Sequence, residues 1–354
     1  MLKISELILR KPVKKWNLLV ASATVKSIWL TRAFEKAVFL MMSPKRQLRV
    51  AIAGGRGIGR VHARIFHALG ANVCAVLGSS QESAEDVAWT LETALGTKIQ
   101  PFHQLDSLLE ESKPDAITIC TPPHLHFEGI MAAFNRSVPV FCEKPLFWHK
   151  KITQGEVKEK LATIRRHPNR RFFINTCNVN FLDHVVERFG VGTNIQSFYF
   201  QFYSRGKHVQ RDIAADLLPH GLSLVLRLLG NAEIINLTED TREHSYKCQF
   251  QYNGSAVEFD FQENSDGPKA LTFAINGRAF TRIQEGGDAT YRVYLKDSYT
   301  GKITETQDPF QLYIKRFLDC CNQIRFMQQD DFDEAAANLR LMANILLGKL
   351  NAQR

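Results

Sequence analysis

A glutamate and a lysine follow directly on a short apolar run within residues 138–146, which read VPVFCEKPL. The run over residues 140–142 has the length of a buried parallel strand, and it ends where Glu143, Lys144 and Pro145 begin. In open α/β sheets, ligands bind at the carboxyl ends of the strands, so the ammonium group of Lys144 is a candidate for contact with a cofactor or substrate. The alternative is an exposed ion pair of Glu143 and Lys144, which would contribute little.

A second candidate pair is formed by Asp216 and His220, which are four residues apart at the start of an apolar helix predicted over residues 212–230. Residues at i and i+4 lie on one helix face, so the carboxylate is expected to fix the tautomer of the imidazole and to raise its basicity. A histidine tuned in this way is a good general base for a hydroxyl proton. The alternative is an acid at a helix N-terminus with an unrelated histidine.

A glycine-rich turn lies between a predicted strand over residues 48–53 and a helical pattern over 61–69. This order places backbone N–H groups and a helix N-terminus against a phosphate, so the turn is expected to hold the pyrophosphate of a dinucleotide. The residues of the turn are Gly54, Gly55, Arg56, Gly57, Ile58 and Gly59. Arg56 stands where the strict G-x-G-x-x-G pattern has its second glycine, so a shifted turn through Gly55 or Gly57 is expected, and packing alone is the alternative.

The next predicted strand leads into hydroxyl groups instead of a carboxylate. An NAD site commonly has Asp or Glu here for the ribose hydroxyls, whereas this chain has Ser79 and Ser80. Their hydroxyls can bind a 2′-phosphate without charge repulsion, so NADP is the favoured cofactor and NAD stays open. A further predicted strand, over residues 116–120, ends in Thr121 and Pro122, which are expected to wall the nicotinamide side.

The order of the elements predicts the fold class, α/β followed by α+β. Buried strands alternate with helices of about a dozen residues, which predicts a Rossmann-type doubly wound parallel sheet in a dinucleotide-binding domain over residues 47–178. Residues 179–354 contain strands of alternating polarity and Asn-Gly turns, which predict a substrate domain with a largely antiparallel open sheet and helices. The last two helices, over 310–325 and 333–350, are expected to cover one domain.

Length and charge bound the classes of function. The chain has 354 residues, which exceeds the usual size of one core and predicts two domains, and its 45% apolar and 23% charged composition is that of a soluble globular protein. Residues 1–46 hold ten Lys or Arg against two Glu, so +8 of the net charge of +9 lies there. The nearly neutral remainder offers no basic face for nucleic acid. The extension is typical of a transit peptide or amphipathic surface helix, or it precedes a start at Met41 or Met42, which we prefer.

Cysteine usage and hydropathy bound the location. Seven cysteines form no CxxC pair and no zinc-like spacing with histidine, so no metal site is expected. Four of them fall in predicted buried strands, which indicates a reducing compartment. No apolar run reaches the ~18 residues of a membrane helix, so no span is expected. We therefore expect a cytoplasmic protein, with organelle import through residues 1–46 as the alternative.

Three further motifs follow the glycine turn. They are Gly-Arg-Val-His at 59–62, Thr-Pro-Pro-His-Leu-His at 121–126 and Cys-Glu-Lys-Pro-Leu at 142–146. In this order and spacing the chain resembles the Gfo/Idh/MocA oxidoreductases over roughly residues 48–350. The resemblance implies a nicotinamide cofactor, commonly NADP, with the Glu-Lys element at the cofactor and the lysine beside both nicotinamide and substrate.

The resemblance also assigns the second half of the site. It implies that the Asp-x-x-x-His element, Asp216 and His220, meets Lys144 across a cleft. Leu218 stands where a glycine is usual, which leaves the shape of the substrate open.

Together these features predict an NADP-dependent oxidoreductase that moves hydride between nicotinamide and a carbinol or carbonyl carbon of a sugar, polyol or related small molecule. His220 would exchange the hydroxyl proton, Asp216 would orient His220, and Lys144 would donate a hydrogen bond to the substrate oxygen. An imine or enone reductase and a regulatory protein that binds the dinucleotide without turnover are the alternatives. The second sheet is expected either to line the substrate cleft or to join subunits of a homo-oligomer.

Overall fold

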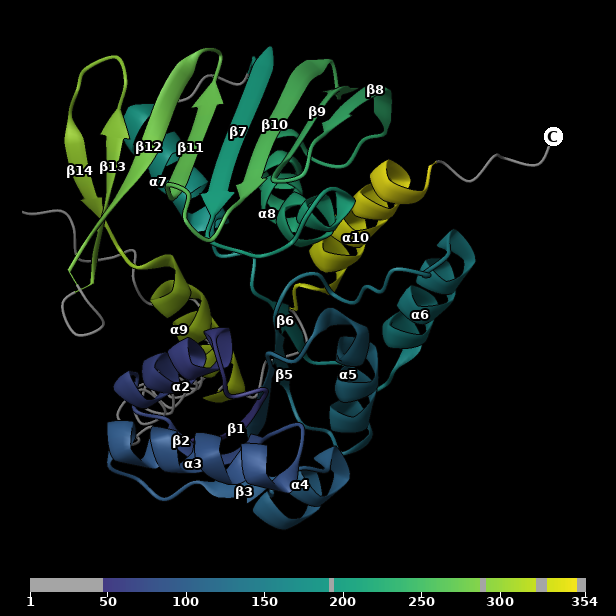
Figure 1. Ribbon diagram of the computed structural model, residues 1–354, viewed down its shortest axis with the longest axis vertical. Coiled ribbons are helices and arrows are strands. Elements are labelled where there is room, and N and C mark those ends of the chain that lie inside the picture. Colours follow the sequence, from purple (N-terminus) through teal and green to yellow (C-terminus); the bar gives the residue numbers. More distant parts are fainter. Residues whose placement is uncertain (1–46, 191–193, 287–290, 323–329, 349–354) are drawn as a thin grey trace, which may run out of the picture. The chain divides into compact units, whose positions relative to one another are not determined.

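The computed structural model describes residues 47–190, 194–286, 291–322 and 330–348, so the predicted basic extension over residues 1–46 lies outside the described part. Two β-sheets organise these residues, and helices pack against both sheets (Figure 1). The predicted fold class, a doubly wound parallel sheet followed by a largely antiparallel sheet, is confirmed.

The first sheet has six parallel strands in the order β3-β2-β1-β4-β5-β6. Its strands are β1 (Arg49–Ala53), β2 (Asn72–Leu77), β3 (Gln100–Phe102), β4 (Ala116–Ile119), β5 (Val140–Cys142) and β6 (Phe172–Ile174). The helices between them are α2 (Ile58–Ala68), α3 (Gln81–Leu95), α4 (Leu105–Ser112), the short 3₁₀ helix η1 (Pro123–Leu125), α5 (His126–Asn135) and α6 (Gln154–Arg166).

Both faces of this sheet are covered, which explains why its strands are almost continuously apolar. Alternate residues of β1 enter different apolar clusters. Val50 and Ile52 pack in the cluster that includes residues of α2 and α3, whereas Ala51 and Ala53 pack in the cluster that includes residues of α4 and α5. Helices on both faces leave the carboxyl ends of the strands as the open edge of the sheet, and every predicted cofactor residue follows a strand at that edge.

The second sheet has eight strands in the order β14-β13-β12-β11-β7-β10-β9-β8, all antiparallel to their neighbours except for the parallel pair of β7 and β10. Its strands are β7 (Ser197–Ser204), β8 (Ile234–Thr241), β9 (Ser245–Tyr252), β10 (Ser255–Glu263), β11 (Ala270–Ile275), β12 (Arg278–Glu285), β13 (Arg292–Asp297) and β14 (Ile303–Thr306). Two helices, α7 (Val179–Phe189) and α8 (Arg211–Leu229), lie between β6 and β8 in the chain, and Figure 1 shows both beside one face of the sheet.

Both Asn-Gly turns form hairpins, as predicted. Asn253 and Gly254 join β9 to β10, and Asn276 and Gly277 join β11 to β12. The φ angles of the two pairs are 50° and 80°, and 50° and 82°. Positive φ at both central residues is the geometry of a type I′ turn, whose twist matches that of the flanking strands.

The last two helices do not cover one domain, so that prediction is wrong. Helix α9 (Pro309–Asn322) packs on α2, and the ring of its Phe317 contacts the rings of Phe66, Phe141 and Phe173 in the first sheet's core. Helix α10 (Phe332–Leu347) packs on α8 and also on α6 and β6. Each helix therefore returns to the first sheet after the chain has completed the second, because each carries apolar side chains that fit there.

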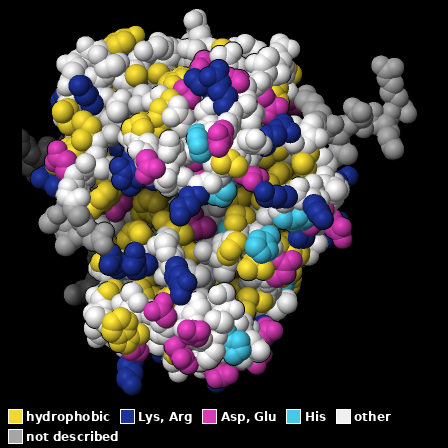
Figure 2. All heavy atoms as spheres, in the orientation of Figure 1, with side chains coloured by type: hydrophobic (Ala, Val, Ile, Leu, Met, Phe, Trp, Pro, Cys, Tyr) yellow, Lys and Arg dark blue, Asp and Glu magenta, His cyan; other side chains and the backbone are white. Residues whose placement is uncertain are grey.

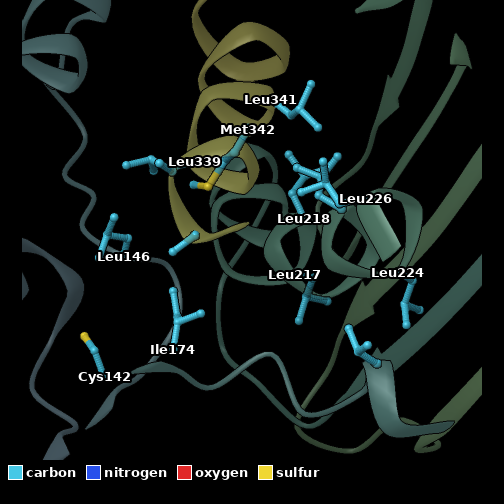
Figure 3. Packing of buried hydrophobic residues seen from close by; sticks show 14 of the residues in the cluster. Cys142, Leu146, Ile174, Leu217, Leu218, Leu224, Leu226, Leu339, Leu341 and Met342 are labelled. Atoms are coloured by element: carbon cyan, nitrogen blue, oxygen red, sulfur yellow. The ribbon is translucent and has the colours of Figure 1, made fainter. Parts of the chain in front are cut away.

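One apolar cluster runs from the first sheet to α8 and α10 (Figure 3). Leu339 and Met342 of α10 lie between the leucines of α8 and the side chains of Leu146 and Ile174. Leu146, Ile174, Leu339 and Met342 are at most 2% exposed, and the leucines of α8 that Figure 3 labels are at most 9% exposed. The cluster therefore holds the end of β5, where Lys144 lies, at a fixed position relative to α8.

Charged side chains of both signs are interspersed on the face of the molecule seen in Figure 2, and hydrophobic side chains are visible in the hollow across its middle. Among the described residues, no helix combines the length and the apolar character needed to cross a bilayer.

Replacing Gly221 by alanine tests how closely α8 packs on the second sheet. An added Cβ would lie 2.8 Å from Phe259 Cζ and 3.1 Å from Phe200 Cδ1, and both rings are fully buried. We expect Gly221→Ala to lower the free energy of unfolding by about 1–3 kcal/mol, measured by urea unfolding. Gly155→Ala is the matched control, because Gly155 lies exposed in α6 and its Cβ would have only Thr153 Oγ1 at 3.8 Å. Equal stability of the two variants would contradict the described packing.

Candidate active site

The glycine turn after β1 is tight because backbone from three segments meets there. Gly54 has a φ of 87°, and a Cβ on it would lie 2.7 Å from Cys120 O at the end of β4. A Cβ on Gly59 would overlap Gly54 O. The turn leads into α2, whose N-cap residue, Gly57, makes no side-chain capping bond, and no acidic residue lies in the first turn of the helix. A helix N-terminus without a protein cap is suited to bind an anion such as a phosphate.

A pocket of about 570 Å³ lies against this turn. Six of the predicted cofactor residues line the pocket: Gly54, Gly55, Arg56, Ser79, Thr121 and Pro122. The other residues of the glycine turn form its far side and the start of α2. Ser80 has a different task, because its side chain accepts a hydrogen bond from Ser83 N (3.2 Å) as the N-cap of α3. The predicted contact of a ribose phosphate with a serine therefore falls on Ser79.

Arg56 lies beside this end of the pocket but is already paired. Its guanidinium donates a hydrogen bond to Asp86 on α3 at 3.1 Å, and both side chains are more than 60% exposed. An exposed pair of this kind is weak, so a phosphate group could compete with Asp86 for Arg56.

Thr121 supplies an unused polar group to the pocket. Its Oγ1 is buried and has no hydrogen-bond partner in the described structure, although buried hydroxyls normally have one. Its backbone carbonyl lies 2.7 Å from His126 Nε2, and His126 Nδ1 lies 2.9 Å from the carbonyl of Pro145. The imidazole of His126 thus joins the loop after β4 to the loop after β5. An orphaned hydroxyl, a cradle that only glycine fits and an uncapped helix end together fit a bound dinucleotide.

Glu143 points into the protein instead of toward the pocket. Its Oε1 accepts a hydrogen bond from Asn175 Nδ2 (2.5 Å) and lies 2.9 Å from His62 Nε2, although the ring N–H is not aligned for a hydrogen bond. Burial disfavours the charged form of His62, but Cys120 and Glu143 outweigh burial and raise the pKa of His62 to about 10. Glu143 and His62 therefore form a buried ion pair, and Glu143 is not among the residues that line the pocket.

Lys144 reaches across from the first sheet to α8. Its Nζ donates hydrogen bonds to Asp216 Oδ1 (2.7 Å) and to Asp216 O (3.0 Å), and its side chain is 12% exposed. Burial alone would raise the pKa of Asp216, but the ammonium group of Lys144 holds it well below its usual value. Ile119 of β4 pairs with Cys142 of β5, so Thr121 and Lys144 each stand two residues beyond the paired strands, at the same edge of the sheet. The structure thus brings Lys144 together with Asp216 next to the loop that lines the pocket.

His220 lies one turn after Asp216, but the two side chains share no hydrogen bond in the described structure. Its Nδ1 is 3.3 Å from Asn178 Nδ2, and its ring meets the ring of Phe202 edge-on at 5.0 Å between centroids. Burial, followed by the positive charge of Lys144, lowers the pKa of His220 to about 3, and the opposing effect of Asp216 is smaller. Asp216 thus raises the pKa of His220, as expected, but by less than burial and Lys144 lower it, and no described hydrogen bond from Asp216 fixes the tautomer. Asn178 contacts the imidazole instead, and His220 is neutral.

A second carboxyl group stands beside Asp216. Glu263 at the end of β10 is fully buried, and its Oε2 accepts hydrogen bonds from His208 N and from the His208 ring, both at 2.9 Å. Burial and the neighbouring Asp216 raise the pKa of Glu263. Ligand atoms of His208, Asp216 and Glu263 lie within 4.8 Å of one another, the spacing of a cation site. The ammonium group of Lys144 already supplies a positive charge to Asp216.

Sequence reasoning missed Asn175, Asn178, His208 and Glu263. Asn175 follows directly on β6 and Asn178 stands three residues further on, so the edge argument that singled out Lys144 and Thr121 also applies to this segment. His208 and Glu263 stand in a loop and at the end of an antiparallel strand, and no local pattern marks them.

Comparison with known proteins finds a family match for one part of the chain. Residues 48–175 match the model of the Gfo/Idh/MocA group, described as an oxidoreductase family with an NAD-binding Rossmann fold. An inositol 2-dehydrogenase of Saccharopolyspora erythraea is 33% identical over 123 residues, which are 34% of this chain and 35% of that protein. A 2,7-anhydro-N-acetylneuraminate hydratase of Mediterraneibacter gnavus is 30% identical over 98 residues, 28% of this chain and 23% of that protein. The chain thus covers about a third or less of the length of these curated relatives.

Solved structures share the fold over both sheets. A UDP-N-acetylglucosamine 3-dehydrogenase of Acidithiobacillus ferrooxidans has a TM-score of 0.63 at 20% identity and covers 85% of this chain and 96% of its own. A 3-ketoreductase of Actinomadura kijaniata, solved with NADP and TDP-benzene, has a TM-score of 0.67 at 16% identity and covers 86% and 98%. The match to the Gfo/Idh/MocA oxidoreductase family thus covers residues 48–175, and the solved structures extend the likeness, in fold alone, to both sheets.

Proposed function

We propose that this protein is an NAD(P)-dependent oxidoreductase that transfers hydride between nicotinamide and a carbinol or carbonyl carbon of a sugar, polyol or related small polar molecule. Residues 47–178 would bind the cofactor and residues 179–354 the substrate. The observation that carries the proposal is the meeting of Lys144, from the edge of the dinucleotide-binding sheet, with Asp216 beside His220 on α8. Names of relatives such as inositol 2-dehydrogenase support this class of substrate.

The dinucleotide would lie in the pocket against the glycine turn. Gly54, Gly55 and the N-terminus of α2 would hold its pyrophosphate, Ser79 its adenine ribose, and Thr121 and Pro122 its nicotinamide end. When bound, the nicotinamide ring supplies the acceptor or donor of the hydride.

Lys144 and its partner form the electrostatic part of the site. The substrate oxygen carries negative charge when the hydroxyl proton is removed before hydride leaves the carbinol carbon, and in the reverse direction when hydride adds to the carbonyl carbon. A positioned ammonium group stabilises that charge. Lys144 donates two hydrogen bonds to Asp216, so a third N–H remains for the substrate oxygen. Asp216 would therefore orient Lys144, a role different from the one predicted for it.

His220 would take or return the hydroxyl proton. A neutral imidazole has one nitrogen that accepts and one that donates, and its partner decides which is which. The amide of Asn178 can present either its N–H₂ or, after turning over, its oxygen to His220 Nδ1. With its oxygen toward Nδ1–H, Asn178 would hold the tautomer whose Nε2 accepts the hydroxyl proton, and the imidazolium so formed would return that proton in the reverse direction.

NADP is the cofactor we favour. No carboxylate stands at Ser79, and Arg56 lies at the same end of the pocket with only an exposed partner, Asp86. Among the similar solved structures, one was determined with NADP and another with NAD, so the family accepts both kinds of cofactor.

We further propose that the outer face of the second sheet joins subunits of a homo-oligomer. Tyr203 and Lys247 both donate hydrogen bonds to Asp260 Oδ2 on this face, each at 2.9 Å. Such a network gives a flat polar-aromatic surface suited to a contact between copies.

Removing the charge of Lys144 tests the mechanism. We expect Lys144→Met to lower kcat for oxidation of a polyol or sugar by about 10²–10³-fold, the usual effect of losing one group that stabilises charge in the transition state. Lys315→Met, an exposed lysine on α9 paired with Asp319, is the control and should retain full activity. Steady-state kinetics on both variants, checked for folding by circular dichroism, decide the matter. Full turnover by Lys144→Met would remove the proposed mechanism.

The neutral state of His220 predicts an unusual pH dependence. Its folded pKa of about 3 lies below the ordinary value of 6.5, so the unfolded chain takes up a proton in this window while the folded protein does not. His220 therefore makes the folded protein less stable as pH falls from 6.5 toward 3, and His220→Asn should lose less stability than wild type between pH 7.5 and 4.5 in urea unfolding. The ring proton of His220 should also show no titration between pH 5 and 8 by NMR. A titration near pH 6.5 would contradict the described burial.

Cofactor binding can be measured without a known substrate. We expect NADP to raise the melting temperature more than NAD, because a bound ligand stabilises the folded state by mass action. Thr121→Val should leave the free protein as stable as wild type, because Oγ1 has no partner, yet weaken dinucleotide binding by about five- to tenfold. Thr163→Val, on the exposed side of α6, is the control. If neither NADP nor NAD raised the melting temperature, the cofactor assignment would be overturned.

A further inference from the structure

Arg282 on β12 is a half-buried arginine without an anionic partner. Its guanidinium makes no hydrogen bond and no ion pair with any residue that the structure describes. Its Cζ lies 5.9 Å from the centroid of the Phe202 ring. Burial lowers the pKa of Arg282, which reflects the cost of withdrawing its charge from water.

Arg278 on the same strand is an arginine whose charge is paired with a carboxylate. It stands four residues before Arg282, and because side chains alternate along a strand, both lie on one face of the sheet. Arg278 donates two hydrogen bonds to the buried carboxylate of Asp297, at 3.1 and 2.7 Å, and packs on the rings of Phe189 and Phe280. A buried arginine normally requires such a carboxylate, and Arg282 lacks one.

Arg282 lies beside the proposed catalytic groups. Phe202 contacts both the guanidinium of Arg282 and the imidazole of His220. The charge of Arg282 acts on His220 and on Cys177, which immediately precedes Asn178, the hydrogen-bond partner of His220. Four elements of the chain, β12, β7, α8 and the segment after β6, thus converge around this guanidinium.

The other charges of the site are matched within the protein. Lys144 is paired with Asp216, and Glu143 lies against the protonated imidazole of His62. Burial and the neighbouring Asp216 raise the pKa of Glu263, whose carboxyl group accepts hydrogen bonds from His208. Asp308 acts on Cys177 as Arg282 does, but burial raises the pKa of Asp308 and its carboxylate accepts a hydrogen bond from Phe310 N. The guanidinium of Arg282 therefore has no ion-pair partner among the described residues.

We propose that Arg282 binds an oxyanion of the substrate, so that the protein acts on a sugar or polyol that carries a carboxylate or phosphate group. This inference rests on the proposed function and narrows its substrate class. A guanidinium offers two parallel N–H donors that match the oxygens of a carboxylate or phosphate, and the interaction is strong where water is excluded. The hydroxyl group that reacts would lie between this anchor and Lys144.

Binding of an oxyanion tests the inference without requiring turnover. Isothermal titration of the full-length protein with glucuronate, glucose 6-phosphate and neutral myo-inositol would compare wild type with Arg282→Met. We expect glucuronate or glucose 6-phosphate, whichever class the site accepts, to bind wild type and to lose at least tenfold in affinity in Arg282→Met. Arg292→Met is the matched control, because Arg292 is an exposed arginine on β13 paired with Glu305, and it should bind as wild type does. Equal affinity of Arg282→Met and wild type for both anions, or binding of myo-inositol alone, would overturn the inference.

Stability distinguishes ligand binding from a structural role. If Arg282 is held for a ligand, Arg282→Met without ligand should melt at the same temperature as wild type or higher, because an uncompensated buried charge has been removed. A clear loss of stability would mean that Arg282 serves the fold. Arg282→Lys, which keeps the charge but not the paired donors, should retain only part of the affinity.

The test is separate from that of the proposed function. With an accepted anionic substrate, Arg282→Met should raise KM at least tenfold and change kcat less, whereas Lys144→Met should lower kcat and leave binding of the anion by Arg282 in place. Anion binding that depends on Arg282 in a protein without any dehydrogenase activity would leave this inference standing and remove the enzyme proposal.

Discussion

The hydrogen bonds from Lys144 Nζ to Asp216 constrain the rest of the site. They join the edge of the parallel sheet to the helix that supports the antiparallel sheet, with both the carboxylate and the backbone carbonyl of Asp216 as acceptors. A pair of charges this far from water adds little net stability, but it allows few relative positions of its two elements. The apolar cluster of Leu146, Ile174 and the leucines of α8 and α10 also holds the edge of the first sheet against α8.

The electrostatics of the site follow from where water is excluded. His62 and His220 are both withdrawn from water, yet their pKa values move in opposite directions, to about 10 and about 3. His62 has a carboxylate next to it, whereas the nearest strong charge for His220 is the ammonium group of Lys144. His62 is therefore paired as a cation with Glu143, whereas His220 is neutral near pH 7.

Sequence reasoning located what local patterns determine. The strand that ends at Lys144, the glycine turn before α2 and both Asn-Gly hairpins were predictable, because strand length, turn chemistry and alternation act over a few residues. The interaction partners of the individual side chains could not be predicted in this way. Asp216 hydrogen-bonds with Lys144 and not with His220, and α9 packs on α2, because both outcomes depend on segments distant in the chain. Ser80 caps its own helix through Ser83 N, a local pattern that sequence reasoning did not use. No local sequence pattern marks Arg282, because what distinguishes it is the lack of a carboxylate partner among the described residues.

The path of the chain through α9 and α10 has a consequence for how this protein can be divided. Phe317 of α9 completes the ring packing between Phe66, Phe141 and Phe173, more than a hundred residues after the last strand of that sheet. The nucleotide-binding half is therefore not a contiguous stretch of sequence. A gene fragment that stops after β6 would encode the whole sheet yet leave an aromatic surface bare, so recombination with a foreign second half must bring a matching α9 with it.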